Sequence, residues 1–180
     1  MSNNWLCSDL HLGHKNILNF DKDNSFSSEE ERSNIIVQNI AGCVKKRDVL
    51  WVLGDSVFTK ERLALLDLIQ CTKKLVAGNH CAEKYDQKLL YEKFDYVYGI
   101  QKKYGCWLSH APIHPMELRG CFNVHGHTHG TFMEIEYTHR EEVWTETDPR
   151  YINMCIENHN YMPKDLNWLK GEMEERRKLL

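Results

Sequence analysis

Five short polar motifs, built from Asp, Asn and His, occur between residues 9 and 129. In chain order they are Asp9-Leu10-His11, Gly54-Asp55, Gly78-Asn79-His80, Ser109-His110 and Gly126-His127-Thr128-His129. Carboxylate, amide and imidazole groups form a mixed oxygen and nitrogen set that suits Mn, Fe, Zn or Ni, without the thiolates of a soft-metal site or the all-oxygen shell of a calcium site. The residue types therefore predict a transition-metal site, provided that the fold brings the motifs together.

Each motif lies at or just after the end of a short apolar run that is typical of a buried strand. These runs are Trp5-Leu6-Cys7, Val49–Leu53, Lys74–Ala77, Cys106–Ser109 and Cys121–Val124. In open α/β sheets, ligands bind beyond the carboxyl ends of the strands, so the motifs are expected to meet at one rim. Any one of these residues alone is more often a loop cap than a ligand. Their joint occurrence, each after an apolar run, favours a metal centre.

Helical segments separate the first strands. Ser27 and Ser28, with Glu30 and Glu31 three positions on, form a capping-box pattern that predicts a helix over 28–46. A second helix is expected from Thr59 to about Gln70. Pro163 and the apolar spacing after it predict a final amphipathic helix.

The second half of the chain is richer in strands. Further strands are predicted near Tyr96 to Lys102, Phe132 to Tyr137 and Tyr151 to Ile156, with a hairpin turn at Tyr104-Gly105. The polar stretch 138–150 is expected to be an exposed hairpin loop or insertion. The chain therefore reads as an α/β protein with a single domain over 1–180.

Composition limits the expected cellular location and binding partners of the protein. No apolar stretch approaches the roughly 20 residues that span a bilayer, and the start of the chain has no basic leader, so no membrane association and a cytoplasmic location are expected. The seven Cys form no CxxC pair, which predicts reduced thiols. A net charge of −3 gives no diffuse basic field, so nucleic acid is a possible but not a favoured partner. A nucleotide substrate remains possible because metal cations supply local positive charge.

The five motifs in this order resemble the pattern of the calcineurin-like metallophosphoesterase superfamily. That pattern runs D-x-H, G-D, G-N-H, H and G-H-x-H, and it covers Asp9 to His129 here. The opening Ser8–His14 and the tail around Asn153 to Pro163 are similar to the small, minimal members found in bacteria and phages. The resemblance implies a two-sheet αββα sandwich with a centre of two metal ions at the sheet rim.

The resemblance also implies a role for each motif. Seven ligands would hold two divalent metal ions. Mn²⁺ is the expected ion, and Fe, Zn or Ni are the alternatives. A hydroxide between the two ions would attack phosphorus. His80 would act as general acid on the leaving oxygen. The first metal would be held by Asp9, His11 and His129, the second by Asn79, His110 and His127, and Asp55 would bridge both.

One departure from the family pattern bears on function. The protein phosphatase branch has a carboxylate and an arginine shortly after its G-D motif, whereas Gly54-Asp55 is followed by Ser56–Thr59 here. The partner of His80 is therefore missing from its usual position, and phosphoprotein substrates are disfavoured. The expected activity is hydrolysis of small or exposed phosphodiesters or phosphomonoesters. The alternatives are a nuclease of the same superfamily and, less favoured, a non-catalytic scaffold.

For each of the remaining histidines, a structural role is at least as well supported by the sequence as a functional one. His14 serves either the substrate or the turn that holds it, and His114 lies in a solvated loop or lines the cleft. His125 is expected to pack on its strand, and His139 and His159 to lie on the surface.

Overall fold

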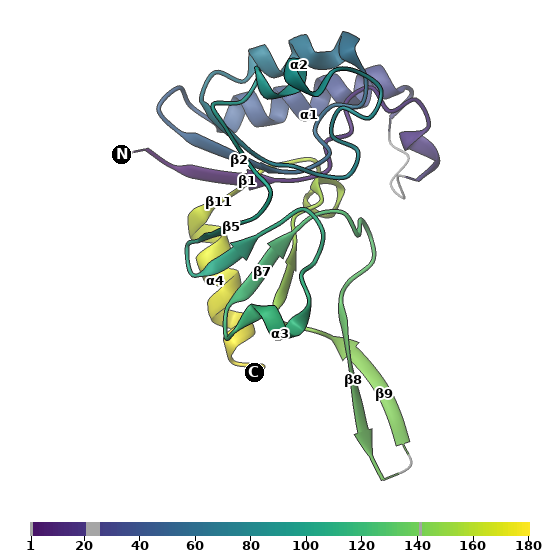
Figure 1. Cartoon of the computed structure of the whole chain (residues 1–180), viewed down its shortest axis with the longest axis vertical. Helices are drawn as coiled ribbons and strands as arrows, with labels where there is room; N and C mark the ends of the chain where they lie inside the picture. Colours follow the sequence, from purple (N-terminus) through teal and green to yellow (C-terminus); the bar gives the residue numbers. More distant parts are fainter. Residues whose placement is uncertain (1, 21–25, 141) are drawn as a thin grey trace.

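The computed structural model describes residues 2–20, 26–140 and 142–180, and two main sheets organise the described chain (Figure 1). The first sheet has five strands in the order β11-β1-β2-β3-β4. β1 to β4 run parallel to one another, and β11 pairs antiparallel with β1. The bounds are β1 (Asn4–Cys7), β2 (Val49–Leu53), β3 (Thr72–Val76), β4 (Tyr96–Tyr98) and β11 (Lys164–Asp165).

The second sheet has four strands in the order β10-β7-β6-β5. β10, β7 and β6 are parallel, and β5 pairs antiparallel with β6 through the hairpin predicted at Tyr104-Gly105. The bounds are β5 (Gln101–Lys103), β6 (Cys106–Leu108), β7 (Phe122–His125) and β10 (Tyr151–Asn153).

Helices connect the strands and cover the first sheet. The capping prediction for α1 is confirmed, because the Ser28 hydroxyl accepts from the Glu31 N–H and the Glu31 carboxylate accepts from the Ser27 N–H. The α-helices are α1 (Glu29–Cys43), α2 (Gln87–Tyr91), α3 (Pro115–Leu118) and α4 (Leu166–Arg177). The 3-10 helices are η1 (Ile17–Asn19), η2 (Lys60–Leu68) and η3 (Ile156–His159).

Two hydrophobic cores lie on opposite faces of the first sheet because successive side chains of a strand point to opposite faces. Leu50 and Val52 face the core beneath α1, where Ile36 and Ile40 are fully buried. Trp51 of the same strand faces the core between the two sheets. Other members of that core are Leu53, Val76, Leu108, Val124, Ile152 and, from α4, Leu169 and Met173. The mixed α/β class predicted from sequence is confirmed.

An antiparallel hairpin of β8 (Glu134–His139) and β9 (Glu142–Thr147) extends away from the rest of the molecule (Figure 1). The exposed hairpin expected at 138–150 is therefore present, but it begins earlier and comprises both strands. Glu141, which separates the two strands in sequence, lies outside the described residues.

Two other sequence predictions need correction. The helix expected from Thr59 to about Gln70 is a 3-10 helix over Lys60–Leu68. The strand expected from Tyr96 to Lys102 is two strands in different sheets, since the chain crosses between the sheets at Gly99-Ile100. None of the described helices is long and apolar enough to cross a membrane.

Candidate metal centre

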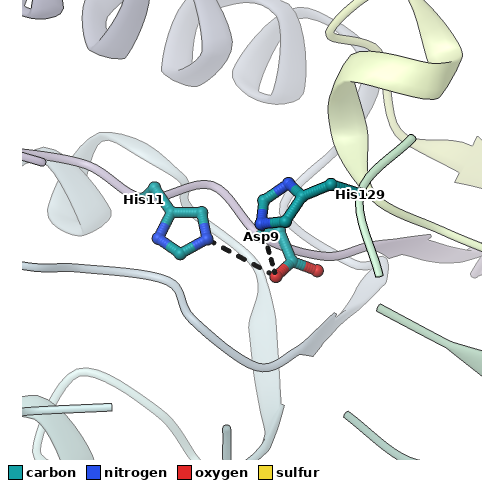
Figure 2. Close-up of side chains that lie close together, drawn as sticks. All are labelled: Asp9, His11 and His129. Atoms are coloured by element: carbon teal, nitrogen blue, oxygen red, sulfur yellow. Dashed lines mark ion pairs between the residues drawn. The ribbon is translucent and has the colours of Figure 1, made fainter. Parts of the chain in front are cut away.

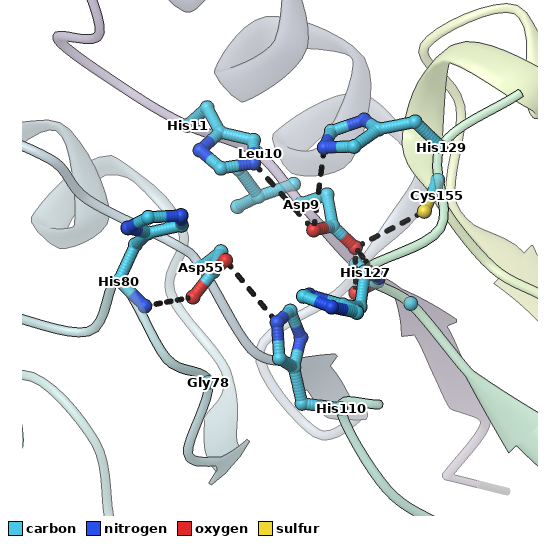
Figure 3. Close-up of polar contacts among 12 residues, drawn as sticks. Asp9, Leu10, His11, Asp55, Gly78, His80, His110, His127, His129 and Cys155 are labelled. Carbon is cyan, nitrogen blue, oxygen red and sulfur yellow. Dashed lines mark hydrogen bonds and ion pairs between the residues drawn. The ribbon is translucent and has the colours of Figure 1, made fainter. Parts of the chain in front are cut away.

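The polar motifs converge at the carboxyl ends of the parallel strands, as the strand-end argument predicted (Figure 3). Their backbone is unusual there. Positive φ angles occur at five of the seven expected ligands, namely Asp9 (56°), His11 (48°), Asp55 (44°), His127 (70°) and His129 (50°). A non-glycine residue in this region costs about 1 to 2 kcal/mol, and such residues cluster at functional sites. Five of the eleven non-glycine residues with positive φ in the described chain therefore lie at this rim.

The first cluster consists of Asp9, His11 and His129 (Figure 2). Nε2 of His11 lies 3.5 Å from Oδ1 of Asp9, and Nε2 of His129 lies 4.0 Å from the same oxygen. Ligand atoms that share one metal at about 2.0 to 2.2 Å sit about 3 to 4 Å apart. The three groups therefore have the spacing of metal ligands.

The two oxygens of Asp9 have different surroundings. Oδ2 accepts hydrogen bonds from the Ser8 hydroxyl, the His127 N–H at 2.9 Å and the Cys155 thiol at 3.2 Å. Among the described residues, Oδ1 has no hydrogen-bond partner although it is buried, and the same holds for both ring nitrogens of His11. Buried polar atoms are nearly always satisfied, so these orphan atoms match a cation that would bind them.

The second cluster consists of Asp55, His110 and His127. Nε2 of His110 lies 3.2 Å from Oδ2 of Asp55 and 2.8 Å from Oδ1 of Asn79, which brings the fourth expected ligand into contact with this cluster. Nδ1 of His110 donates to the Leu53 carbonyl at 2.9 Å. That hydrogen bond assigns the ring proton to Nδ1, so Nε2 of the neutral ring can bind a metal.

Glycines of the motifs let functional side chains approach the backbone closely. A Cβ at Gly126 would lie 1.9 Å from the Ser8 hydroxyl and 2.2 Å from Oδ2 of Asp9, and one at Gly78 would lie 2.2 Å from Oδ1 of Asp55. From the other side, the buried Arg32 of α1 donates to the Leu10 carbonyl at 2.8 Å and holds the Asp-x-His loop. Each carboxylate is thus fixed by several distant parts of the chain.

His80 has a partner that the sequence did not identify. Its Nδ1 lies 3.0 Å from Oε2 of Glu83, and its backbone N–H donates to Oδ1 of Asp55 at 2.9 Å. The side chain is 40% exposed and lines the same pocket as His11 and Asp55. When Glu83 accepts the Nδ1 proton, Nε2 is left available to a ligand in that pocket. The only sequence signal for Glu83 is its position one helical turn beyond His80.

Two residues after β10 also belong to the site. Oε1 of Glu157 accepts from Nδ1 of His129 at 2.5 Å, an arrangement that orients metal-binding histidines in many proteins. Cys155 contacts Asp9, and its bridge to Ser8 joins the two sheets at the rim. His129, Cys155 and Glu157 also form a group that could hold a metal. Sequence reasoning missed both Cys155 and Glu157, whose one signal is their place after a strand.

Electrostatics at the site favour a charged carboxylate beside histidines. Burial alone raises the pKa of Asp9, but its contact with His11 and the charge of His110 outweigh burial and hold the pKa well below its usual range. Burial lowers the pKa of His110, yet Asp55 and Asp9 raise it more strongly. The hydrogen bond that His129 donates to Glu157 raises the pKa of His129, whereas burial and the nearby His110 lower the pKa of His127.

The other histidines divide as follows. His125 is buried and packs on its strand, as expected, and His139 and His114 are exposed. His159 is half-buried against Trp168, with its Nε2 2.9 Å from the Asn153 carbonyl, so the surface prediction for it is wrong. His14 lies at the rim of the metal-centre pocket, 5.8 Å from His11 between ring centroids.

The chain is similar in sequence to three known proteins over most of its length. No family model matches it. It is 26% identical over 176 residues to the uncharacterised protein MJ1445 of Methanocaldococcus jannaschii, covering 95% of this chain and 91% of that protein. It is 29% identical over 183 residues to the Gene 66 protein of Mycobacterium phage L5, a match that covers 82% of this chain and 87% of that protein. It is 27% identical over 200 residues to the Gene 66 protein of Mycobacterium phage D29, covering 92% of this chain and 94% of that protein.

A solved structure shares the fold. The crystal structure of a protein of unknown function, AQ665 from Aquifex aeolicus, superposes with a TM-score of 0.68 at 24% identity, covering 95% of this chain and 99% of that one. This solved structure therefore supports the architecture over nearly the whole chain.

Proposed function

We propose that the chain is a metal-dependent phosphoesterase with two divalent ions, of the calcineurin-like type that its motifs resemble. The observation that carries the proposal is the pair of Asp and His clusters on one rim. In the described part of the chain, Oδ1 of Asp9, Oδ2 of Asp55 and the His11 ring nitrogens are buried there without hydrogen bonds. The packing of one sheet on the other supports the sandwich part of the proposed family fold.

The residues present fit divalent Mn, Fe or Zn, because the donor atoms belong to carboxylate and imidazole groups and to the side-chain amide of Asn79. One ion would be held by Asp9, His11 and His129 and the other by Asn79, His110 and His127, and the Asp55 carboxylate would be shared by both ions. Bound there, the ions would supply a water-derived nucleophile at neutral pH and stabilise charge on the phosphoryl oxygens. Mn²⁺ is the proposed native ion.

The protein side chains would bind and orient the ester. A pocket of about 500 Å³ opens over both clusters and is lined by His11, Asp55, His80, His127 and His129. In the proposed hydrolysis, water releases one proton to solvent, its oxygen bonds to phosphorus, and the ester P–O bond breaks with its electron pair leaving on the ester oxygen. His80, oriented by Glu83, would give the proton on Nε2 of its doubly protonated ring to the leaving oxygen.

The direct test uses purified protein stripped with EDTA and reloaded with Mn²⁺. We expect hydrolysis of bis(p-nitrophenyl) phosphate or p-nitrophenyl phosphate that requires Mn²⁺ and disappears on chelation. Full turnover after exhaustive chelation would overturn the proposal. Degradation of single-stranded DNA without turnover of small esters would assign the rival nuclease activity, and metal binding without any turnover would assign a scaffold.

A further inference from the structure

A second pocket adjoins the candidate metal centre and shares His14 with it. This outer pocket has a volume of about 730 Å³ and is lined mainly by Gly13–Asn16, Phe58–Thr59, Arg62 and Lys84. From His11, ring contacts lead outward to His14 at 5.8 Å and from His14 to Phe58 at 4.2 Å. The outer pocket therefore lies one layer of side chains beyond the first metal cluster.

Its inner wall is firmly built. The Gly13 N–H donates to Oε1 of Glu29 at 2.6 Å, and Oε2 of Glu29 binds the Arg62 guanidinium at 3.1 Å. A Cβ at Gly13 would lie 2.5 Å from the Thr59 hydroxyl oxygen, so the loop after His11 packs tightly on the start of η2. The ion pair with Glu29 therefore balances the Arg62 charge and stabilises the inner wall of the outer pocket.

Two other cations of the outer pocket are uncommitted. Among the described residues, Lys15 and Lys84 have no carboxylate within ion-pair distance, and both are exposed. Nζ of Lys84 lies 4.5 Å from the Phe58 ring centroid, which places the ammonium group over the face of this aromatic ring. One exposed carboxylate, Glu61, opposes the two ammonium groups.

A polar atom of the shared wall also lacks a partner. Nδ1 of His14 is buried without a hydrogen bond among the described residues. The ring itself packs edge-on against Phe58 and Phe20, at 4.2 and 6.2 Å between centroids. Among the described residues, the outer pocket thus combines an aromatic surface, an imidazole nitrogen without a hydrogen bond and two ammonium groups without a carboxylate partner.

We propose that the outer pocket binds a second phosphate group of the substrate, so that the preferred substrate is a small phosphoester that carries two phosphates, such as a nucleoside bisphosphate. The inference rests on the proposed function, which puts the scissile phosphate at the metal centre. Lysine is a compact point charge well suited to a phosphate. The aromatic surface of His14 and Phe58, between the two sites, suits a sugar or base. The same chemistry would accept the neighbouring phosphate of a nucleic-acid strand.

The test compares two substrates in the Mn²⁺-loaded protein. Adenosine 3′,5′-bisphosphate carries both phosphates, and adenosine 3′-monophosphate or 5′-monophosphate carries one. The variant Lys15→Met/Lys84→Met removes both charges but keeps straight apolar stems. The control Lys88→Met removes an exposed lysine of α2 that lies outside the pocket and pairs with Glu92 at 4.0 Å.

We expect the wild type to prefer the bisphosphate in kcat/KM by about tenfold or more, and the double variant to lose most of that preference through KM. Lys88→Met should keep the preference. A double variant that retains the preference, or a wild type that has none, would overturn the inference. If kcat/KM on oligothymidylates rises with length beyond two phosphates and depends on the two lysines, the second phosphate belongs to a strand.

A separate binding measurement separates this inference from the proposed reaction. If the wild type hydrolyses none of these substrates, the proposed function fails. Calorimetric titration of EDTA-treated protein with adenosine 3′,5′-bisphosphate then decides the inference alone. Binding weakened about tenfold in the double variant, but not in Lys88→Met, would support the outer pocket as a phosphate site. Equal or absent binding in wild type and double variant would reject it.

Discussion

The backbone N–H of His127 donates a 2.9 Å hydrogen bond to Oδ2 of Asp9, across 118 positions of sequence. This contact joins the ends of β1 and β7, one from each sheet (Figure 3). It also determines which Asp9 oxygen faces the first cluster, because Oδ2 is occupied and Oδ1 is left unpartnered. The contact requires Gly126, whose missing side chain leaves the space that Ser8 and Asp9 occupy.

Replacing Gly126 with Ala should therefore disrupt the metal centre. The added Cβ would lie 1.9 Å from the Ser8 hydroxyl and 2.8 Å from the Ser8 Cβ, so the β1 end or the β7 end must shift. We expect at least about a tenfold loss in Mn²⁺ affinity, measured by calorimetric titration, since a displaced ligand typically costs metal sites 10-fold or more.

Gly42→Ala is the matched control. Gly42 lies in α1, its φ is not positive, and a Cβ added there would meet nothing within 4 Å. Alanine there should raise the free energy of unfolding by up to about 1 kcal/mol and leave Mn²⁺ affinity unchanged. A Gly126→Ala protein that binds Mn²⁺ like the wild type would show that the packing of Gly126 against Asp9 is not required.

Asp55→Asn should reduce both metal content and activity. Asp55 is the one carboxylate of the second cluster, and its Oδ2 lies 3.2 Å from Nε2 of His110. The amide keeps the shape and can still accept from the His80 N–H, but it loses the charge that would be shared by two cations. Metal analysis after gel filtration should show fewer ions per chain than in the wild type. Unchanged stoichiometry and activity would remove Asp55 from the bridging role.

The strand ends could be predicted from sequence because the signal is local. Val49–Leu53 is an uninterrupted apolar run followed by Gly54-Asp55, and it forms the buried strand β2 within those bounds. Parallel strands then bring their carboxyl ends together without further information. The capping pattern at Ser28 and Glu31 is local in the same way.

The remaining features depend on contacts that no local pattern encodes. Cys155 reaches Asp9 because Ser8 and Cys155 form a bridge between the sheets, 147 positions apart in sequence. The interval from Tyr96 to Lys102 looks like one strand, yet its two halves pair with β3 and β6 respectively. Glu83 was missed because the expected partner of His80 was sought after Gly54-Asp55, and the structure supplies one from the turn that follows His80 itself.

His125 should make the metal-free protein sensitive to acid. Burial lowers its pKa from 6.5 to about 4, and its Nδ1 donates to the Gly126 carbonyl at 2.7 Å. A group whose pKa is depressed on folding stabilises the protein above its unfolded pKa and loses that contribution as pH falls. The loss should therefore begin near pH 6.5 and reach about 2 kcal/mol by about pH 5. Urea unfolding of EDTA-treated protein measures this loss directly.

The matched variant for this pH effect is His125→Asn, which keeps a donor near the position of Nδ1 but does not titrate. Between about pH 7.5 and pH 5, the free energy of unfolding should fall in both proteins. The fall should be about 2 kcal/mol smaller in the variant than in the wild type. Parallel pH curves for the two proteins would show that His125 does not carry the effect.

His80 and Glu83 should act on the leaving group rather than on metal binding. His80→Ala should retain metal content but slow the release of an alkoxide by about 10² to 10⁴-fold, whereas nitrophenolate, which leaves without a proton, should suffer much less. Glu83→Ala should show the same selectivity to a smaller degree, because Glu83 only orients Nδ1 of His80, at 3.0 Å.

The control for both variants is Glu92→Ala, which removes an exposed carboxylate at the end of α2 and should leave both rates unchanged. Equal slowing of both substrates with full metal occupancy would make His80 a phosphate-positioning group, and loss of metal would place it among the ligands.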